Sequence, residues 1–302
     1  MTYILEPYDN ALRTILETGV HKVNRTGVDS IAVFDIESRY KIDEFLPVVT
    51  GRKVWPKSIF AELLWMLSGS TNNKDLQAMG SNIWTPWVNP EFEKKHGYVE
   101  GSLGPIYGFQ LRHFGGTYGN GGGGVSFAKE NYITRGKENV SIYGAGGFDQ
   151  LAYMVDRLKN HPDCRRNLFS LWNPRDLHKM VLAPCHYTFQ VFTHDGKLSG
   201  KLTQRSADFP VGIPANIQFY STFIYMLAQQ CGYEPYEFVH STVDSHIYVN
   251  QIDAVKEYLA RPKPDSPKLK LNKAEDIYSY KLDDFELLDY NPLAKIDIPV
   301  AV

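Results

Sequence analysis

The sequence predicts one large α/β domain, in which helices pack on one side of a twisted, mostly buried sheet. Three observations predict this class. Asp195-Gly196 lies between two arms of alternating apolar residues, which is the strongest short signature of a β-hairpin. Residues 238–249 alternate between polar and apolar, as a strand does. The segments 148–159 and 217–231 have helical spacing with one apolar stripe each, and such a stripe is buried by packing against a second layer.

The first third of the chain mixes helix and strand signals. Helical spacing predicts a helix over residues 8–18, and alternation predicts a strand over 30–42. Pro56 opens a further helix that ends near Gly69, because proline is favoured in the first turn of a helix and glycine after its last. Glu62 lies at the edge of the apolar stripe of this helix. A carboxylate there is costly unless it is hydrogen-bonded or neutral, although a glutamate can also reach solvent past the stripe.

The second half of the chain has a denser pattern. In chain order we expect a helix over 148–159, a short apolar run over 168–172, hairpin arms over 187–193 and 197–205, a helix over 217–231, a strand over 238–249 and a helix over 253–259. Gly232 closes the longest helix. The chain ends in an apolar tail, residues 298–302.

A glycine-rich segment interrupts these elements. Residues 115–124 contain seven glycines in ten positions, which predicts a mobile loop. A phosphate-binding loop would be flanked by a strand and a helix in a fixed pattern, and neither is present in the sequence here. We interpret residues 115–147 as an insertion with little core of its own, and therefore treat 1–302 as a single domain.

Composition excludes several classes of protein. With 302 residues, of which 43% are hydrophobic and 22% charged, the chain can bury a large core without disulfide or metal support. A net charge of −2 argues against broad nucleic-acid binding. No apolar run approaches the roughly 18 residues of a membrane span, and the start lacks the features of a signal peptide. Three sparse cysteines, at 164, 185 and 231, predict reduced thiols in the cytoplasm.

The hairpin places a cysteine beside an arginine. If Asp195-Gly196 is a two-residue turn, paired residues have numbers that sum to about 391, so Cys185 lies opposite Ser206 and diagonal to Arg205, within about 7–8 Å. A bulge would shift this pairing by one residue. A neighbouring guanidinium favours the thiolate, which is the nucleophilic form. The alternative is a buried, inert cysteine.

The strand over 238–249 sorts its side chains onto two faces. The polar face carries His240, Thr242, Asp244, His246 and Tyr248. Such a face is either the floor of a site or a hydrated sheet surface. A metal-dependent hydrolase that uses His240, Asp244 and His246 is one alternative, although the spacing matches no established metal motif.

Four arginines are candidates for binding an anion. They are Arg165, Arg166, Arg175 and Arg205. Guanidinium groups bind phosphate bidentately, so a cluster of them suits a phosphorylated ligand. An isolated arginine pair is also common on a solvated surface.

Several short motifs follow one another through the same half of the chain. They are Arg165-Arg166, Trp172-Asn173-Pro174, Asp176-Leu177 with Met180, Ala183-Pro184-Cys185-His186, Gln204-Arg205-Ser206-Ala207-Asp208, Gly212 with Pro214 and Asn216-Ile217, and Asp244 with His246-Ile247-Tyr248. Together with residues 24–87, they resemble the folate-dependent thymidylate synthase family. The resemblance covers most of the chain outside the glycine-rich insertion, and its motifs are dense.

The resemblance implies an activity and a set of site residues. The implied reaction is methylation of dUMP by 5,10-methylenetetrahydrofolate, which gives dTMP and dihydrofolate through a bond between Cys185 and C6 of the pyrimidine. The implied catalytic residues are Cys185, Glu62, Tyr107, Asp208, Asn216 and Arg205. Those implied to bind dUMP are Arg25, Arg165, Arg166, Arg205, Ser206, Asp208, Asn216, His246 and Tyr248. Those implied to bind the folate are Trp84, Trp87, Asp208, Gly212 and Val302.

The chemistry of Asn216 supports uracil as the base. An asparagine amide presents both a donor and an acceptor, which match O4 and N3–H of uracil. An aspartate at this position would instead suit cytosine. No metal is implied by the resemblance.

The resemblance also implies a partner and a closing movement. The uncovered face of the sheet is expected to form a homodimer by sheet-on-sheet packing, and Arg165 and Arg166 to reach the partner's phosphate site. The apolar tail is expected to fold over the bound ligands and exclude water. Some members of the family bind RNA, so a non-catalytic binder is a further alternative, although the charge balance gives it no support.

The sequence departs from the family pattern at several positions. Pro210 and Ala215 replace larger residues, Val243 replaces a glycine, Gly200 replaces a larger residue, and the segment 49–53 is altered. Several of these changes are expected to border the folate or C5 of the pyrimidine. They leave open a dUMP hydroxymethylase as an alternative, in which water captures the methylene group because Ala215 and Pro210 admit it.

Overall fold

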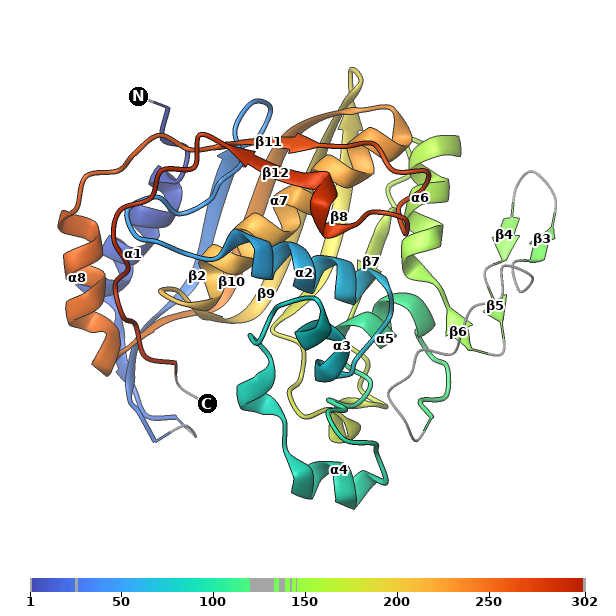
Figure 1. The fold of residues 1–302 in the computed structure, drawn as a ribbon, viewed down its shortest axis with the longest axis horizontal. Helices are drawn as coiled ribbons and strands as arrows, with labels where there is room; N and C mark the ends of the chain where they lie inside the picture. Colours follow the sequence, from blue (N-terminus) through green and yellow to red (C-terminus); the bar gives the residue numbers. More distant parts are fainter. Residues whose placement is uncertain are drawn as a thin grey trace.

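The computed structural model describes residues 2–24, 27–119, 133–135, 139–141, 143–144 and 146–300 (Figure 1). Most of the segment predicted to be an insertion, 115–147, therefore lies outside the described residues. Its described parts form two short antiparallel pairs. These are β3 (Ile133–Arg135) with β4 (Asn139–Ser141), and β5 (Tyr143–Gly144) with β6 (Gly147–Phe148).

A six-stranded sheet forms the centre of the molecule, in the order β1-β2-β10-β9-β8-β7. The strands are β1 (Val20–Lys22), β2 (Ser30–Lys41), β7 (Leu168–Ser170), β8 (His186–His194), β9 (Lys197–Asp208) and β10 (Glu234–Tyr248). Strands β9 and β10 run parallel, and the other neighbouring pairs are antiparallel. The parallel pair matters for function because both strands deliver side chains to the same edge of the sheet.

Helices cover one face of this sheet, as predicted (Figure 1). The longest, α7 (Gly212–Cys231), packs on β9 and β10 and also contacts α2 (Pro56–Leu67) and α6 (Gln150–Asn160). In the described parts of the chain, the remaining α-helices are α1 (Glu6–Thr18), α3 (Asn73–Ala78), α4 (Pro90–His96), α5 (Tyr107–His113) and α8 (Ile252–Ala260). A small sheet of β11 (Lys268–Leu271) and β12 (Phe285–Leu288) crosses in front of α7.

The core lies between α7 and the inner face of the sheet. Phe189 and Leu202 from the sheet and Phe223 from α7 are almost fully buried there. Gly200 belongs to this layer, because a Cβ at Gly200 would lie 2.5 Å from the ring of Phe189 and 2.8 Å from Ile224. Gly200 therefore makes room for core side chains, and it is not among the changed positions that line the cavity described below.

The opposite face of the sheet carries exposed and charged residues. Phe192 is 65% exposed, and Lys201 and Ser241 both bond to Glu37 across three neighbouring strands. No helix packs on this face among the described parts of the chain (Figure 1). The homodimer expected from sheet-on-sheet packing stays a prediction.

One predicted boundary differs from the structure in a way that affects the site. The helix predicted over 217–231 begins at Gly212, so Pro214 and Asn216 lie in its first turns rather than in a loop. Proline is tolerated there because the first helical N–H groups have no partner within the helix. Asp195 and Gly196 both have positive φ angles, 47° and 74°, as a two-residue hairpin turn requires.

Candidate active site

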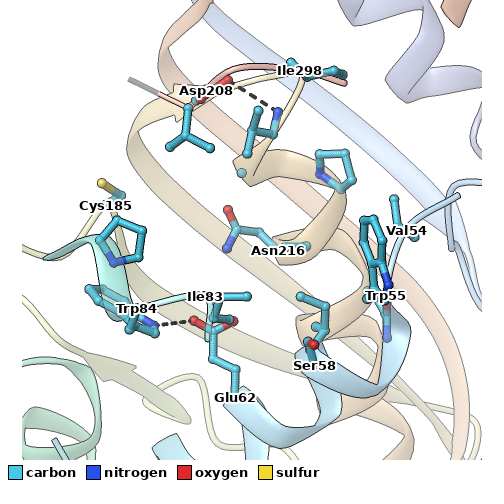
Figure 2. Close-up of a pocket in the computed structure, with 18 of the residues that line it drawn as sticks. Val54, Trp55, Ser58, Glu62, Ile83, Trp84, Cys185, Asp208, Asn216 and Ile298 are labelled. Atoms are coloured by element: carbon cyan, nitrogen blue, oxygen red, sulfur yellow. Dashed lines mark hydrogen bonds between the residues drawn. The ribbon is translucent and has the colours of Figure 1, made fainter. Parts of the chain in front are cut away.

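A cavity of about 750 Å³ opens between α2, the start of α7, the ends of β8 to β10 and the C-terminal segment (Figure 2). This volume lies within the usual range of small-molecule sites. The predicted site residues on its wall are Glu62, Trp84, Trp87, Tyr107, Cys185, Ser206, Asp208, Gly212, Asn216, His246 and Tyr248. Segments distant in sequence thus meet around one space, as a site for two ligands requires.

Cys185 lies immediately before β8, opposite Arg205 rather than Ser206. The hairpin follows the predicted register from its turn as far as Thr188, where a bulge between His186 and Thr188 adds one residue to β8. The backbone N–H of Arg205 therefore donates to the carbonyl of Cys185 at 2.9 Å. The predicted pairing with Ser206 was wrong by one residue, because turn geometry fixes the register only up to a bulge.

The guanidinium of Arg205 is held beside the thiol. Its Nη2 lies 3.8 Å from Sγ of Cys185. Two main-chain carbonyls fix its orientation: Nε donates to Pro184 and Nη2 to Ala183, both at 2.9 Å. The group also lies over the ring of Trp172, 5.5 Å from its centroid. A fixed positive charge at this distance favours the thiolate form of Cys185.

Glu62 faces the cavity from α2 and is hydrogen-bonded, which is one of the two outcomes expected for a carboxylate at the edge of the apolar stripe. Nε1 of Trp84 donates to Oε1 of Glu62 at 2.7 Å (Figure 2). Burial raises the pKa of Glu62 to about 7, and the bond from Trp84 offsets part of that effect. A carboxyl group that titrates near neutral pH can both take up and release a proton at that pH.

Tyr107 supports the cysteine from the other side. Its hydroxyl accepts a hydrogen bond from the backbone N–H of Cys185 at 2.9 Å. Burial raises the pKa of Tyr107 well above 10, so it stays a neutral phenol. Its ring stacks on His186, whose Nδ1 lies 2.7 Å from the hydroxyl of Tyr220. Burial lowers the pKa of His186 to about 3, which keeps that imidazole neutral as well.

Asn216 and Asp208 present different groups to the same space. Asn216 points into the cavity from α7, and its amide has no hydrogen-bond partner in the described chain (Figure 2). Asp208 ends β9 and accepts from the N–H of Val211 at 3.3 Å and from Gln251 at 3.4 Å. Burial raises the pKa of Asp208 to about 6. Asn216 is thus free to recognise a ligand, whereas Asp208 is already partly bonded.

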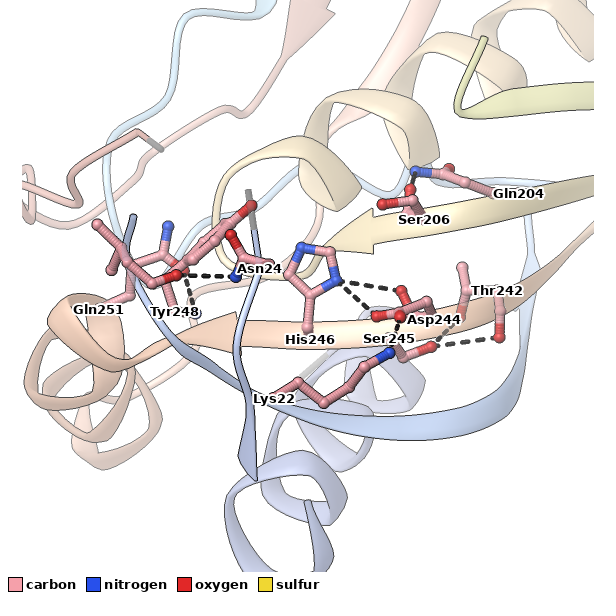
Figure 3. A network of polar contacts seen from close by, with 11 residues as sticks. Lys22, Asn24, Gln204, Ser206, Thr242, Asp244, Ser245, His246, Tyr248 and Gln251 are labelled. Atoms are coloured by element: carbon pink, nitrogen blue, oxygen red, sulfur yellow. Dashed lines mark hydrogen bonds and ion pairs between the residues drawn. The ribbon is translucent and has the colours of Figure 1, made fainter. Parts of the chain in front are cut away.

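His246 is oriented by its neighbour on β10 (Figure 3). Its Nδ1 lies 3.0 Å from Oδ1 of Asp244, which also pairs with Lys22. Burial would raise the pKa of Asp244, but the hydrogen bond from Lys22 and the nearby His246 outweigh it and lower that pKa. With Nδ1 engaged, Nε2 of His246 is left for a ligand. Tyr248 lies beside it on the cavity wall, with its ring edge-on at 5.1 Å.

Several predicted residues lie elsewhere. Arg165 and Arg166 are exposed and do not line this cavity. Arg25 and Val302 lie outside the described residues. Of the two residues expected to admit water, Ala215 lines the cavity but Pro210 does not. The carbonyl of Pro210 accepts a hydrogen bond from Nη2 of Arg52 at 2.7 Å.

The metal-dependent alternative has no support from the geometry. His240 is buried, and its Nε2 lies 3.0 Å from Oε1 of Gln204. Within the described ranges, no group of three or more His, Cys, Asp or Glu side chains is arranged to hold a metal ion. In the same ranges, no helix is long and apolar enough to cross a membrane.

The site residues predicted from the sequence leave one end of the cavity largely unassigned. Arg52, Trp55 and Ser58 line it near the start of α2, and residues 295–298 and 300 line it from the C-terminal segment. Gln251 fixes that segment, because its Nε2 donates to the carbonyl of Pro299 at 2.8 Å. No spacing rule connects these segments. The covering role of the tail was implied only by the family resemblance.

The chain is similar to known proteins over nearly its whole length. The family model described as thymidylate synthase matches residues 6–302. The chain is 38% identical over 299 residues to the thymidylate synthase of Homo sapiens, covering 98% of this chain and 90% of that protein. It is 38% identical over 301 residues to the thymidylate synthase of Corynebacterium aurimucosum, covering 100% and 99%. It is 39% identical over 300 residues, 98% of this chain, to the bifunctional dihydrofolate reductase-thymidylate synthase of Zea mays, and it spans 54% of that longer protein.

Proposed function

The chain belongs to the thymidylate synthase family, and from this we propose that it methylates dUMP at C5 to give dTMP, with 5,10-methylenetetrahydrofolate converted to dihydrofolate. One observation supports the proposal above all. The thiol of Cys185 lies 3.8 Å from the guanidinium of Arg205 and shares a cavity with the unpaired amide of Asn216 and the carboxyl of Glu62. A nucleophile, a base-recognising amide and a proton-transfer group are thus available to one ligand.

Cys185 is the proposed nucleophile. Its thiolate forms a bond to C6 of the pyrimidine, and the electron pair of the C5–C6 double bond then makes C5 nucleophilic. C5 bonds to the methylene carbon and loses its proton, and the bond between that carbon and the folate nitrogen breaks with its electron pair staying on the nitrogen. Hydride added to the methylene carbon then restores the C5–C6 double bond, the C6–S bond breaks and the thiolate is released. The folate supplies the methylene carbon and the hydride that completes the methyl group. Glu62, through cavity water, and Tyr107 are proposed to carry the protons.

The dUMP end of the cavity is proposed to use groups of three kinds. The amide of Asn216 donates to O4 and accepts from N3–H of the uracil. His246 and Tyr248 bind the deoxyribose hydroxyl. Ser206 and Arg205 bind the phosphate, since Nη1 of Arg205 has no hydrogen-bond partner in the described residues while its other nitrogens are engaged.

A dimer would complete the phosphate site. Arg165 and Arg166 are exposed and do not line this chain's own cavity, which suits a role toward a second copy. We propose that they reach the partner's phosphate in a homodimer. Arg25 is proposed to bind the phosphate of its own chain. The cytoplasmic location expected from the cysteines likewise stays a prediction.

The rest of the cavity fits a folate. Its volume exceeds what a nucleotide alone needs, and Ile83, Trp84 and Trp87 form flat apolar walls that suit a fused aromatic ring system. The buried carboxyl of Asp208 is proposed to accept hydrogen bonds from the ring N–H groups. Gly212 is proposed to let the folate approach closely, and Val302 to cover it.

The experiment that tests this proposal is a product assay. The purified protein is mixed with dUMP and 5,10-methylenetetrahydrofolate, dihydrofolate is followed by absorbance, and the nucleotide product is weighed by mass spectrometry. We expect one added methyl group for each dihydrofolate formed. A hydroxymethyl product without dihydrofolate would replace the proposal by the hydroxymethylase alternative, for which Ala215 is then the water entry. The C185S variant should form no product, and C231S should behave as wild type because Cys231 lies outside the cavity.

A further inference from the structure

Gln218 is a buried amide on the cavity wall that the proposed reaction does not use. It lies on α7 one turn beyond Pro214 and Ala215, and it is 1% exposed. Its Nε2 donates to the carbonyl of Pro56, the first residue of α2, at 3.0 Å. That bond fixes the orientation of the amide, because only the nitrogen can donate to a carbonyl. Oε1 of Gln218 must therefore face away from Pro56.

Oε1 of Gln218 has no hydrogen-bond partner among the described residues. It is not sealed in the core either. The fully enclosed polar atoms without a partner include Oγ of Ser221 and Oγ1 of Thr222 on the same helix, but not this oxygen. Since Gln218 lines the cavity, its free acceptor is open to whatever fills that space. An acceptor in such a place is stabilised only by water or by a donor on a ligand.

The position of Oε1 of Gln218 indicates which ligand can contact it. Gln218 is tied to the start of α2, near Trp55 and Ser58, and Figure 2 shows these two residues on the far side of Asn216 from Cys185. A pyrimidine bonded to Cys185 and read by Asn216 does not extend to that end. The part of a folate that extends beyond its fused rings is the aminobenzoyl-glutamate arm. In 5,10-methylenetetrahydrofolate the bridging carbon occupies N10, so the amide linking the ring to the glutamate is the N–H donor of that arm.

We propose that Oε1 of Gln218 accepts a hydrogen bond from this amide N–H and so helps to select the folate. The inference rests on the proposed function, which supplies the ligand. When the arm fills the cavity, water leaves Oε1, and a ligand without a donor at that point leaves the oxygen unpaired. Gln218 therefore binds the arm of the folate and takes no part in the methyl transfer itself.

The experiment compares two ligands on three proteins. The ligands are 5,10-methylenetetrahydrofolate and the same molecule methylated on the amide nitrogen, each titrated calorimetrically with dTMP present, so that C5 is already methylated and no transfer occurs. The proteins are wild type, Q218M and Q229M. Gln229 is the matched control, because it also lies on α7 and donates to a carbonyl, that of Leu271 at 2.9 Å, but outside the cavity.

We expect wild type and Q229M to bind the methylated ligand about threefold to tenfold more weakly than the parent, the effect of one neutral hydrogen bond. Q218M should bind the two ligands with equal affinity, similar to the affinity of wild type for the methylated ligand. If Q218M and wild type prefer the parent folate over the methylated one by the same factor, the inference is overturned. The weaker binding of the methylated ligand would then come from the bulk of its added methyl group and not from a lost hydrogen bond. Equal binding of both ligands by wild type would overturn it without any variant. If wild type makes dTMP yet fails this comparison, only the assignment of Gln218 fails; if it makes none, the proposed function fails.

Discussion

The two ends of the cavity are built in different ways. At the end that holds Cys185, protein partners fix the polar groups. Arg205 bonds to two carbonyls, His246 to Asp244, and Glu62 to Trp84. At the other end, Trp55 is 53% exposed, and the covering segment bonds to the wall through Gln251 and Pro299.

The difference follows from what each end must do. A covalent step needs its groups held within a fraction of an ångström, which partners on every side provide before the substrate arrives. A large second ligand must instead enter and leave, and a segment joined by few bonds can open for it. We therefore expect substitutions at the Cys185 end to change rates strongly, and those at the other end to change mainly the binding of the folate.

The largest effect should come from Cys185. We expect C185S to reduce kcat by about 10⁴-fold or more, because a hydroxyl is a far weaker nucleophile than a thiolate. Binding of dUMP should change little, since the bond to C6 forms only after binding. Steady-state rates together with calorimetric titration of dUMP test this. A variant that keeps a tenth of the activity would contradict the nucleophile assignment.

The next largest effect should come from Glu62. We expect E62Q to lose about 10²-fold to 10⁴-fold in kcat, as is typical when a proton-transfer group is removed. In wild type the carboxylate form should be the active one, so kcat should fall as the pH drops through about 7. This fall of kcat at low pH should be absent in E62Q. If E62Q shows the same fall, a group other than Glu62 causes it.

The raised pKa of Glu62 also predicts an effect on stability. The folded protein holds a proton on Glu62 up to about pH 7, whereas the unfolded chain releases it at an ordinary pKa near 4.5. Stability from this group is therefore complete below pH 4.5 and is lost as the pH rises through 7. E62Q should unfold at a higher Tm than wild type at pH 8, and the difference should shrink toward pH 4.5. Thermal melts across this range measure it.

Substitution of Trp84 should change kcat less than substitution of Glu62, and the direction of the change can be predicted. Its hydrogen bond lowers the pKa of Glu62, so W84F should raise that pKa further and move the acid limb of the kcat profile to higher pH. At pH 7 we expect kcat to fall by about tenfold, the equivalent of one bond to a charged group. A limb that moves to lower pH would contradict the role given to this bond.

The smallest effect should come from the covering segment. Gln251 is fully buried, donates to the carbonyl of Pro299 at 2.8 Å and only weakly, at 3.4 Å, to Asp208, and accepts from the backbone N–H of Tyr248. We expect Q251M to raise KM for the folate about threefold to tenfold while kcat stays within a few-fold of wild type. Q230M is the control, because Gln230 also donates to a carbonyl, that of Ala274, outside the cavity. Equal effects of the two variants would mean that the covering bond has no special role.

The sequence predicted the Cys185 end of the cavity better than the opposite end. Alternation and one Asp-Gly turn were enough to bring Cys185 and Arg205 together, because strand pairing follows from local rules. The bulge that moves the pairing from Ser206 to Arg205 leaves no mark in that pattern. At the other end, Gln218 meets Pro56 across 162 positions of the chain, and the tail meets Gln251 across 48. Such contacts depend on how whole helices pack, which periodicity does not specify.

The start of α7 shows the same limit in one element. Helical spacing placed the start of this helix at residue 217, yet proline is compatible with the first turn of a helix and the structure begins α7 at Gly212. Asn216 gains its position from that turn. Gly200 departs from the family pattern for a reason that lies in the core, since Phe189 fills the space that a side chain would take.

The most direct test of the central claim is the mass of the peptide that contains Cys185. The protein is incubated with dUMP and 5,10-methylenetetrahydrofolate, denatured during turnover, digested and analysed by mass spectrometry. We expect a fraction of this peptide to carry one nucleotide bonded to sulfur, and the peptides of Cys164 and Cys231 to carry none. Turnover without any nucleotide on Cys185, or with the nucleotide on another residue, would contradict the account.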